Sequence, residues 1–333
     1  MLKGLALTPP IIGRIAIGKV VEKNGKRLPE KDDEFTVTSQ VQSKDGWVNH
    51  PVDVTLRKTP EAKLRNIPIR LLFDDPDLNL RANYSLFDRQ TGRPLCVGNG
   101  ETCRRSLAAG VQTLPCPAPE ACDLAKGGFC KPYGRLNVRI GEDDELGSFV
   151  FRTTGFNSIR TLSARLSYFH AVSDGQLSTL PLELRLRGKS TTQSHRAPIY
   201  YVDLTIRTGM TMAEAIASAK AESEVRKVSG FNQPALDEAA RQGFAAGAFE
   251  ESEEDGAAVV EEFYPEEFDS GFEGQSAQGN SDGGRAVGNN GVPPNGIKVG
   301  LADKLNQKAV LMNGHGATVA LNSLSRHAPN GRA

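Results

Sequence analysis

Several stretches of the chain alternate apolar and polar residues, which is the pattern of half-buried β-strands. They cover residues 35–41, 67–73, 84–88, 93–97, 135–140, 148–153, 180–186 and 199–206. Gly92 stands between two of these stretches and supplies the positive φ that a tight turn needs, so residues 84–97 are predicted to form a β-hairpin. Few helical patterns separate the strands, which favours mostly antiparallel pairing over a parallel α/β sheet.

Helical spacing appears in three places. Apolar residues recur every three or four positions across residues 157–169, which predicts a helix there. A second helix is predicted from Thr211 to about residue 228, because Thr211 and Glu214 have the spacing of a capping box. A third is predicted from Pro234, a favourable first-turn residue, to about residue 247. The expected fold class is therefore α+β, with a mostly antiparallel β domain and few helices.

The pattern dissolves beyond residue 250. An acidic run at 250–255 is followed by a stretch rich in glycine, asparagine and serine at 271–300. Such a composition cannot bury enough apolar surface to offset the chain entropy, so a disordered tail is expected. The predicted organisation is a β-rich domain over residues 1–209, a helical extension over 210–249 and a disordered tail over 250–333.

The net charge of the chain is zero, but the charges are segregated along the sequence. Residues 1–212 carry 30 basic against 22 acidic side chains, residues 213–282 carry 4 against 17, and residues 283–333 carry 6 against 1. The corresponding net charges are +8, −13 and +5. A basic body with an acidic tail suits a protein that meets nucleic acid, and a net charge of +8 permits DNA contact without requiring it.

All five cysteines lie between residues 96 and 130, among prolines and glycines that let a short segment wrap a tetrahedral ion. In a reducing cytosol, clustered cysteines are more often metal ligands than disulfides. The segment is therefore predicted to be a zinc knuckle that holds structural Zn²⁺ through Cys103, Cys116, Cys122 and Cys130. Cys96 is the alternate ligand, because it lies in the predicted hairpin and not in the turn-rich segment.

The spacing of the cysteines leaves alternatives open. The gaps are 6, 12, 5 and 7 residues, which match no standard zinc finger or ribbon. An iron–sulfur cluster, a redox pair and incidental thiols are the other interpretations. If zinc is bound by four cysteines, the site has no open position, so the ion would hold structure and not activate water.

A basic face is predicted on the strand near residue 185. Leucines occupy every second position of residues 182–186, and Arg185 and Arg187 lie on the opposite face. Together with Arg160 and Lys189 they are the candidate nucleic-acid-binding residues, because their charges suit phosphate oxygens. The alternative is an ordinary solvated strand face.

The acidic part of the tail contains three aromatic residues, Phe263, Tyr264 and Phe268. Aromatic side chains are costly to leave in water, so in a disordered segment they predict a motif that docks onto a partner. The alternative is a solubilising acidic tail.

Catalytic patterns are weak in this sequence. The five histidines are far apart, and no nucleophile elbow or phosphate loop is present. Asp74, Asp75 and Asp77 could bind a divalent ion or simply form a turn. With no long apolar run and no recognisable signal peptide, a cytoplasmic protein without a membrane span is expected.

Four short pieces of the sequence occur in an order typical of one protein family. They read IPIRLLF at 67–73, CVGNG at 96–100 with the downstream cysteines, FRTTGFNSIR at 151–160, and LPLELRLRGK at 180–189 followed by IYYVD at 199–203. In these pieces the sequence resembles the recombination directionality factor-like proteins of phages and integrated elements, over roughly residues 1–210. Similar sequences are also loosely labelled hydrolase or metal-binding proteins, and the motifs present here support only the metal-binding label.

The resemblance implies a non-catalytic accessory factor in DNA recombination of a phage or other mobile element. Such a factor contacts a serine integrase–DNA complex and switches it from integration toward excision, so DNA is bound directly or through the partner. A second interpretation is a nucleic-acid-binding module whose acidic aromatic tail recruits repair or recombination enzymes. A third, a metal-dependent hydrolase, would need histidines or carboxylates that converge on an open metal site.

Overall fold

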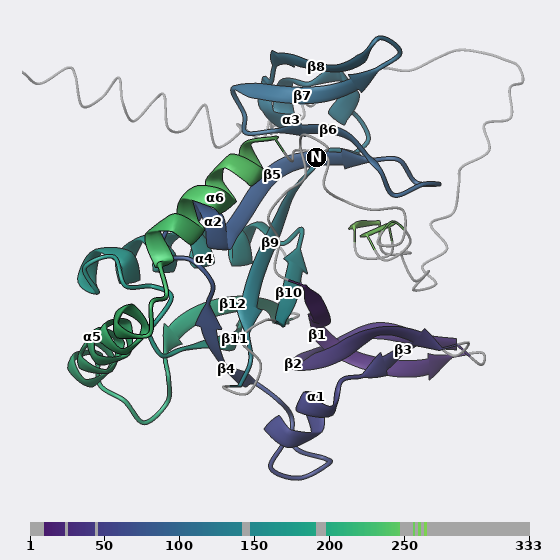
Figure 1. Cartoon of the computed structure of the whole chain (residues 1–333). Coiled ribbons are helices and arrows are strands. Elements are labelled where there is room, and N and C mark those ends of the chain that lie inside the picture. Colours follow the sequence, from purple (N-terminus) through teal and green to yellow (C-terminus); the bar gives the residue numbers. More distant parts are fainter. Residues whose placement is uncertain are drawn as a thin grey trace, which may run out of the picture. The chain divides into compact units, whose positions relative to one another are not determined.

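The described β-strands form one branched sheet, and the candidate sites lie on its branches. The computed structural model describes residues 10–23, 26–43, 46–141, 147–190 and 198–246, together with Gly256, Val259, Val260, Phe263 and Tyr264. Over these residues the fold is α+β with mostly antiparallel pairing, which confirms the predicted class (Figure 1).

The described strands are β1 (Ile11–Lys23), β2 (Lys26–Ser43), β3 (Gly46–Asn49), β4 (Asn66–Leu71), β5 (Leu80–Phe87), β6 (Pro94–Gly98), β7 (Thr102–Leu107), β8 (Gly110–Pro115), β9 (Lys131–Arg139), β10 (Ser148–Thr153), β11 (Leu182–Ser190) and β12 (Pro198–Ile206). Neighbours run in the order β3-β2-β1-β10-β9-β5-β6-β7-β8, and a branch leads from β9 through β4 to β11 and β12. β1 pairs with β10 in parallel, whereas the other described pairs are antiparallel.

The branch arises because one edge of β9 serves two strands. Its residues 131–136 pair with β5, and its residues 138 and 139 pair with β4. The other edge of β9 pairs with β10 through residues 134–138. Leu136 and Val138 are fully buried, so β9 is a central strand. The cysteine-bearing strands and the basic strands therefore extend from the same element.

The described helices are α1 (Pro51–Leu56), α2 (Pro76–Asn79), α3 (Ala118–Ala121), α4 (Phe156–Val172), α5 (Met212–Val228) and α6 (Gln233–Ala246), with a 3₁₀ turn, η1, at Asp123–Ala125. The predicted capping box at the start of α5 is confirmed, since Thr211 Oγ1 accepts from Glu214 N at 3.3 Å and Glu214 Oε2 accepts from Thr211 N at 2.7 Å. None of the helices in the described residues is long and apolar enough to cross a membrane.

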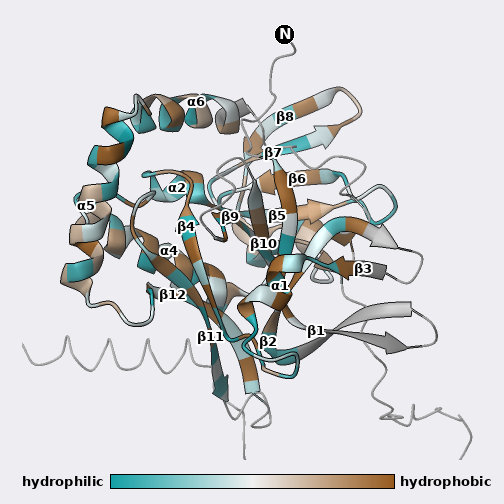
Figure 2. Ribbon diagram, turned by 60° about the horizontal axis from the view of Figure 1, so that its bottom comes forward, coloured by the Kyte–Doolittle hydropathy of each residue, from teal (hydrophilic) through white to brown (hydrophobic). Residues whose placement is uncertain are grey.

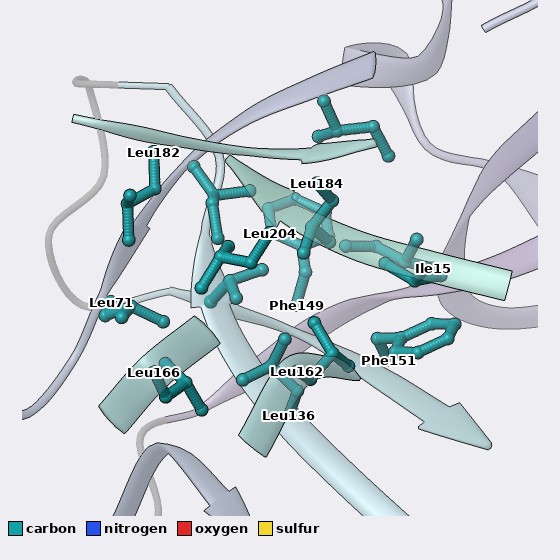
Figure 3. Close-up of a cluster of buried hydrophobic side chains, with 14 of the residues drawn as sticks. Ile15, Leu71, Leu136, Phe149, Phe151, Leu162, Leu166, Leu182, Leu184 and Leu204 are labelled. Atoms are coloured by element: carbon teal, nitrogen blue, oxygen red, sulfur yellow. The ribbon is translucent and has the colours of Figure 1, made fainter. Parts of the chain in front are cut away.

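The main core lies between the sheet and α4. Ile159, Leu162, Leu166 and Phe169 are spaced by three or four residues and form the buried face of this helix. Figure 3 shows Leu162 and Leu166 gathered with Leu136 of β9 and with leucines of β11 and β12. The helix predicted for residues 157–169 is thus confirmed, and its apolar stripe covers the point where the sheet branches.

Helices α5 and α6 cover further apolar surface with one face each. Hydrophilic and hydrophobic residues alternate along both helices in Figure 2, as is usual for helices at the edge of a core. In α5 the small residues Ala215 and Ala219 are fully buried in the main core. In α6, Ala240 packs in a separate cluster with Phe73 and Leu78 of the α2 region.

The structure corrects the sequence interpretation in the cysteine-rich region. Residues 102–107 and 110–115, which read as a turn-rich segment, form the antiparallel strands β7 and β8. The alternation that marks a half-buried strand is weak there, because nearly all residues of β8 are exposed and none is fully buried. Strands β1 and β3 were also missed. Most of the predicted tail, 250–333, falls outside the described residues, and the domain boundaries at 209 and 249 stay predictions.

Candidate functional site

The five cysteines come from separate elements that meet on the β6–β9 arm of the sheet. Cys96 lies in β6 and Cys103 in β7, while Cys116 directly follows β8. Cys122 stands between α3 and η1, and Cys130 directly precedes β9. None of these cysteines, all of which are in the described residues, is part of a disulfide. The topology thus gathers the thiols that the sequence only places within 35 residues of each other.

Gly98 makes room for this cluster. In the register of β6 and β7, Gly98 lies opposite Cys103, and Cys96 lies opposite Arg105. A Cβ atom at position 98 would stand 2.7 Å from Cys103 Cβ and 2.9 Å from Cys116 Sγ, both closer than real contacts allow. The glycine is therefore required by the close approach of two thiol-bearing side chains.

The thiols are close enough to influence one another. Burial raises the pKa of Cys103 to about 11, and its side-chain hydrogen bond with Cys96 acts in the same direction. Burial also raises the pKa of Cys130 to about 11, and the other four thiols of the cluster add to the effect. Reactive cysteines need a lowered pKa, so these two thiols are not suited to nucleophilic chemistry.

The predicted zinc knuckle is not supported by this geometry. Among the described residues, which include every cysteine, no group of three or more histidine, cysteine, aspartate or glutamate side chains is arranged to hold a metal ion. The reason for treating Cys96 as a spare ligand also fails, because Cys96 and Cys103 both lie on strands and are hydrogen-bonded to each other. Zinc binding by Cys103, Cys116, Cys122 and Cys130 therefore stays a prediction.

The predicted basic residues lie on β11 and α4 and are partly paired. Arg185 Nη2 donates to Glu183 Oε1 at 2.5 Å, and Arg187 Nε donates to Asp203 Oδ2 at 3.2 Å. Lys189 Nζ donates to Asn157 Oδ1 at 2.8 Å, at the start of α4. These contacts orient the long side chains along one surface.

The carboxylates of Glu183 and Asp203 do not balance all of the positive charge on this surface. Asp203 also accepts from Arg165 Nε of α4 at 3.0 Å, so it serves two arginines. Arg160 is exposed on the same helix. Arg165 and Arg187 thus pair with Asp203, and Arg185 pairs with Glu183. With Arg160 and Lys189 on the same two elements, β11 and α4, the region carries five cations against these two anions. The structure brings the four predicted nucleic-acid-binding residues to the β11–α4 region, and we call these seven side chains the basic surface.

A hollow of about 390 Å³ next to Cys103 was missed by sequence reasoning. Arg81 of β5, Arg104 of β7 and Arg135 of β9 line it, together with the polar side chains of Asn83 and Asn99 and one carboxylate, Asp77. Such groups suit a phosphate or carboxylate. The three arginines lie on three different strands, so no local pattern in the sequence could have joined them.

The aromatic residues predicted to dock onto a partner contact this chain itself. Phe263 is fully buried in a cluster with Phe87 of β5 and Tyr133 of β9, and Tyr264 packs beside it. Phe268, the third predicted docking residue, lies outside the described residues. Docking onto another protein by these residues stays a prediction.

The other candidate chemical groups have structural roles where they are described. The side chain of His50 caps α1, since its Nδ1 accepts from Val52 N at 3.2 Å, and burial lowers its pKa. Asp75 caps α2 by accepting from Asp77 N at 2.9 Å, and Asp74 accepts from Ser178 N at 2.8 Å. Asp74 and Asp75 therefore anchor the turn between β4 and α2.

Comparisons with known proteins give one match. The family described as recombination directionality factor-like matches residues 12–207, which span β1 to β12 and include the cysteine cluster and the basic surface. No curated protein and no solved structure matches the chain.

We predict that Gly98→Ala destabilises the protein by about 1–3 kcal/mol, because the added methyl group overpacks the space between Cys103 and Cys116. Urea unfolding followed by circular dichroism measures the change. Gly188→Ala in β11 is the matched control, since its new Cβ would meet only the movable Tyr200 ring at 3.3 Å. Equal stability of the two variants would contradict the requirement for glycine at position 98.

Proposed function

Because the chain belongs to the recombination directionality factor-like family, we propose that it is a non-catalytic accessory factor of DNA recombination. In this proposal it contacts the serine integrase–DNA complex of a phage or other mobile element and favours excision over integration. The observation that carries the proposal is the family match over 196 residues, 12–207, which covers nearly the whole described sheet.

The arrangement of the described residues supports a role in contact and not in chemistry. His50, Asp74 and Asp75 serve as helix caps and turn anchors. Without a bound metal ion, burial raises the pKa of Cys103 and Cys130 to about 11, above the range of a catalytic thiolate. The structure instead presents an exposed surface suited to contact, the basic surface on β11 and α4.

The basic surface favours DNA as part of the target. Five cations against two carboxylates leave a positive surplus on β11 and α4, and phosphate contacts of this kind position a protein on DNA without reading sequence. An accessory factor of an integrase needs only such positioning, because the integrase itself selects the site. The same surface would serve the alternative function, a nucleic-acid-binding module that recruits other enzymes.

For the cysteine cluster, we propose that Zn²⁺ is the structural cofactor. Five thiols from five segments share one region, and this supports the proposal because thiolates are the ligands that structural zinc prefers. Since the described thiols do not form a metal-holding group, the ion would have to draw four of them to about 2.3 Å from itself. The ion would then tie β6, β7 and the segment before β9 together.

The recombination role predicts an effect on the direction of the integrase reaction. Added to the purified integrase of the same mobile element, the full chain should raise the yield of excision by at least about tenfold, which corresponds to a coupling of about 1.4 kcal/mol. It should lower the yield of integration in the same assay. Quantitative PCR of the product junctions measures both yields. An unchanged ratio of the two products, with integrase that is active by itself, would sink the proposal.

A prediction for the basic surface concerns the dependence of binding on salt. The double variant Arg160→Ala, Lys189→Ala should bind the integrase–DNA complex more weakly than the wild type, because two phosphate contacts are lost. The slope of log K against log salt concentration should become shallower by about 0.9 for each contact.

Lys227→Ala is the control, because Lys227 is exposed on α5, a helix that contributes no residue to the basic surface, and is paired with Glu224. Fluorescence anisotropy with labelled DNA measures binding in both the presence and absence of integrase. Strong, salt-sensitive binding without integrase would favour the nucleic-acid-binding module. If log K depends on log salt concentration with the same slope in the double variant and the wild type, the basic surface does not contact DNA.

The zinc proposal predicts about one zinc ion per chain in the purified protein, measured by elemental analysis. Cys116→Ser should lose the ion together with much of its stability, since structural zinc contributes directly to folding. Ser106→Ala in β7 is a control that changes no thiol. Metal-free wild-type protein that is fully folded would contradict the proposal.

A further inference from the structure

The contacts around Phe263 define a binding site on the arm that carries the cysteines. The ring centroid of Phe263 lies 4.8 Å from that of Phe87 and 5.7 Å from that of Tyr133, with edge-to-face geometry in both pairs. Val259 is fully buried in the same cluster. We call Phe87, Arg89, Phe129, Lys131 and Tyr133 the aromatic site, and residues 256–264 the capping segment.

Two cations hold the end of the capping segment. Its described residues up to Phe263 are helical, and Lys131 Nζ donates to Phe263 O at 3.3 Å, where a helix end favours positive charge. The guanidinium of Arg89 lies 4.6 Å from the centroid of the Tyr264 ring and 5.3 Å from that of Phe129. The Tyr264 hydroxyl donates to Phe87 O at 3.0 Å.

The start of the capping segment is fitted to the hairpin turn between β5 and β6. Gly256 packs against the turn residues Thr91 and Gly92. A Cβ atom at position 256 would lie 2.3 Å from the carbonyl oxygen of Thr91, which the backbone cannot accommodate. Docking therefore depends on a glycine at one end and on two aromatic residues at the other.

The sequence around the capping segment is complementary to the site in charge. Residues 254–267 carry six carboxylates, at Glu254, Asp255, Glu261, Glu262, Glu266 and Glu267. The aromatic site contributes Arg89 and Lys131. The site lies inside the region that matches the family, 12–207, whereas the capping segment lies outside it. Only residues 247–255 separate it from the end of α6.

We propose that the aromatic site is a binding site for an acidic helical segment with two adjacent aromatic residues, and that the capping segment occupies it as a built-in competitor. A partner protein that presents a segment of this chemistry binds only when it displaces residues 256–264. The proposal is independent of the recombination role, because it concerns what this site holds and not which reaction the partner performs.

The tether makes the competition strong. A segment joined by nine residues is present at its site in an effective concentration on the order of millimolar, so a free segment of equal affinity is largely excluded. Phe263 is the central anchor, and its loss leaves the site open while the sheet that forms the site is unchanged.

The test uses a fluorescein-labelled peptide of residues 254–268 and the full chain, with binding measured by anisotropy. The peptide should bind the Phe263→Ala chain at least about tenfold more tightly than the wild type. Tyr168→Ala, which removes an exposed ring of α4, should behave like the wild type. A peptide with alanine at both positions 263 and 264 should not bind the Phe263→Ala chain.

A second variant covers the case in which Phe263→Ala fails to fold. Gly256→Val keeps every aromatic side chain and expels the capping segment by its clash with Thr91, so it should also bind the peptide at least about tenfold more tightly than the wild type. Adding Arg89→Glu to either variant should abolish peptide binding. Folded variants that bind the peptide no better than the wild type would overturn the proposal, as would binding that survives Arg89→Glu.

Discussion

The structure depends on the way in which β9 shares one of its edges between two strands. Residues 131–136 carry the hydrogen bonds to β5, and residues 138 and 139 carry those to β4. A strand edge normally holds one neighbour, so this division splits the sheet into two arms from one buried strand. The arm of β5 to β8, together with the segment that leads from β8 into β9, holds the cysteines, the arginine-lined hollow and the aromatic site. The arm of β4, β11 and β12, together with α4, holds the basic surface. Helix α4 covers the fork with Leu162 and Leu166, which are almost fully buried.

Much of this architecture could be predicted from local patterns. The stripe from Ile159 to Phe169 identified α4, and the Thr211–Glu214 spacing identified the start of α5, because both signals depend only on neighbouring residues. Strands β7 and β8 were not predicted, because they are largely exposed and their residues lack the alternation of apolar and polar positions that burial imposes. The fork at β9 could not be predicted either, because residue 138 pairs with β4, a strand distant in the sequence, and no local pattern encodes such a pairing.

The candidate site shows the same division between local and distant information. The sequence placed five cysteines in one short segment, and the structure gathers them in one region. What sequence could not provide was the geometry: Cys96 and Cys103 lie on paired strands, and the thiols do not form a metal-holding group in the described residues. Likewise, the aromatic residues of the acidic segment were recognised as too costly to leave in water. Their site on Phe87 and Tyr133, more than 120 residues earlier in the chain, could only be seen in three dimensions.

The family match ends at residue 207, directly after β12, yet the main core does not end there. Ala215 and Ala219 of α5 are fully buried in it, and Arg70 of β4 forms an ion pair with Glu222 at 2.9 Å. Helix α5 is therefore not a detachable appendage, and the border of sequence similarity is not a border of folding. Removal of this helix would expose to water the apolar strip on which Ala215 and Ala219 pack. A homologue without the helix must cover that strip with another segment or carry polar residues there. Residues 12–207 alone, transplanted into such a protein, would leave part of the core exposed.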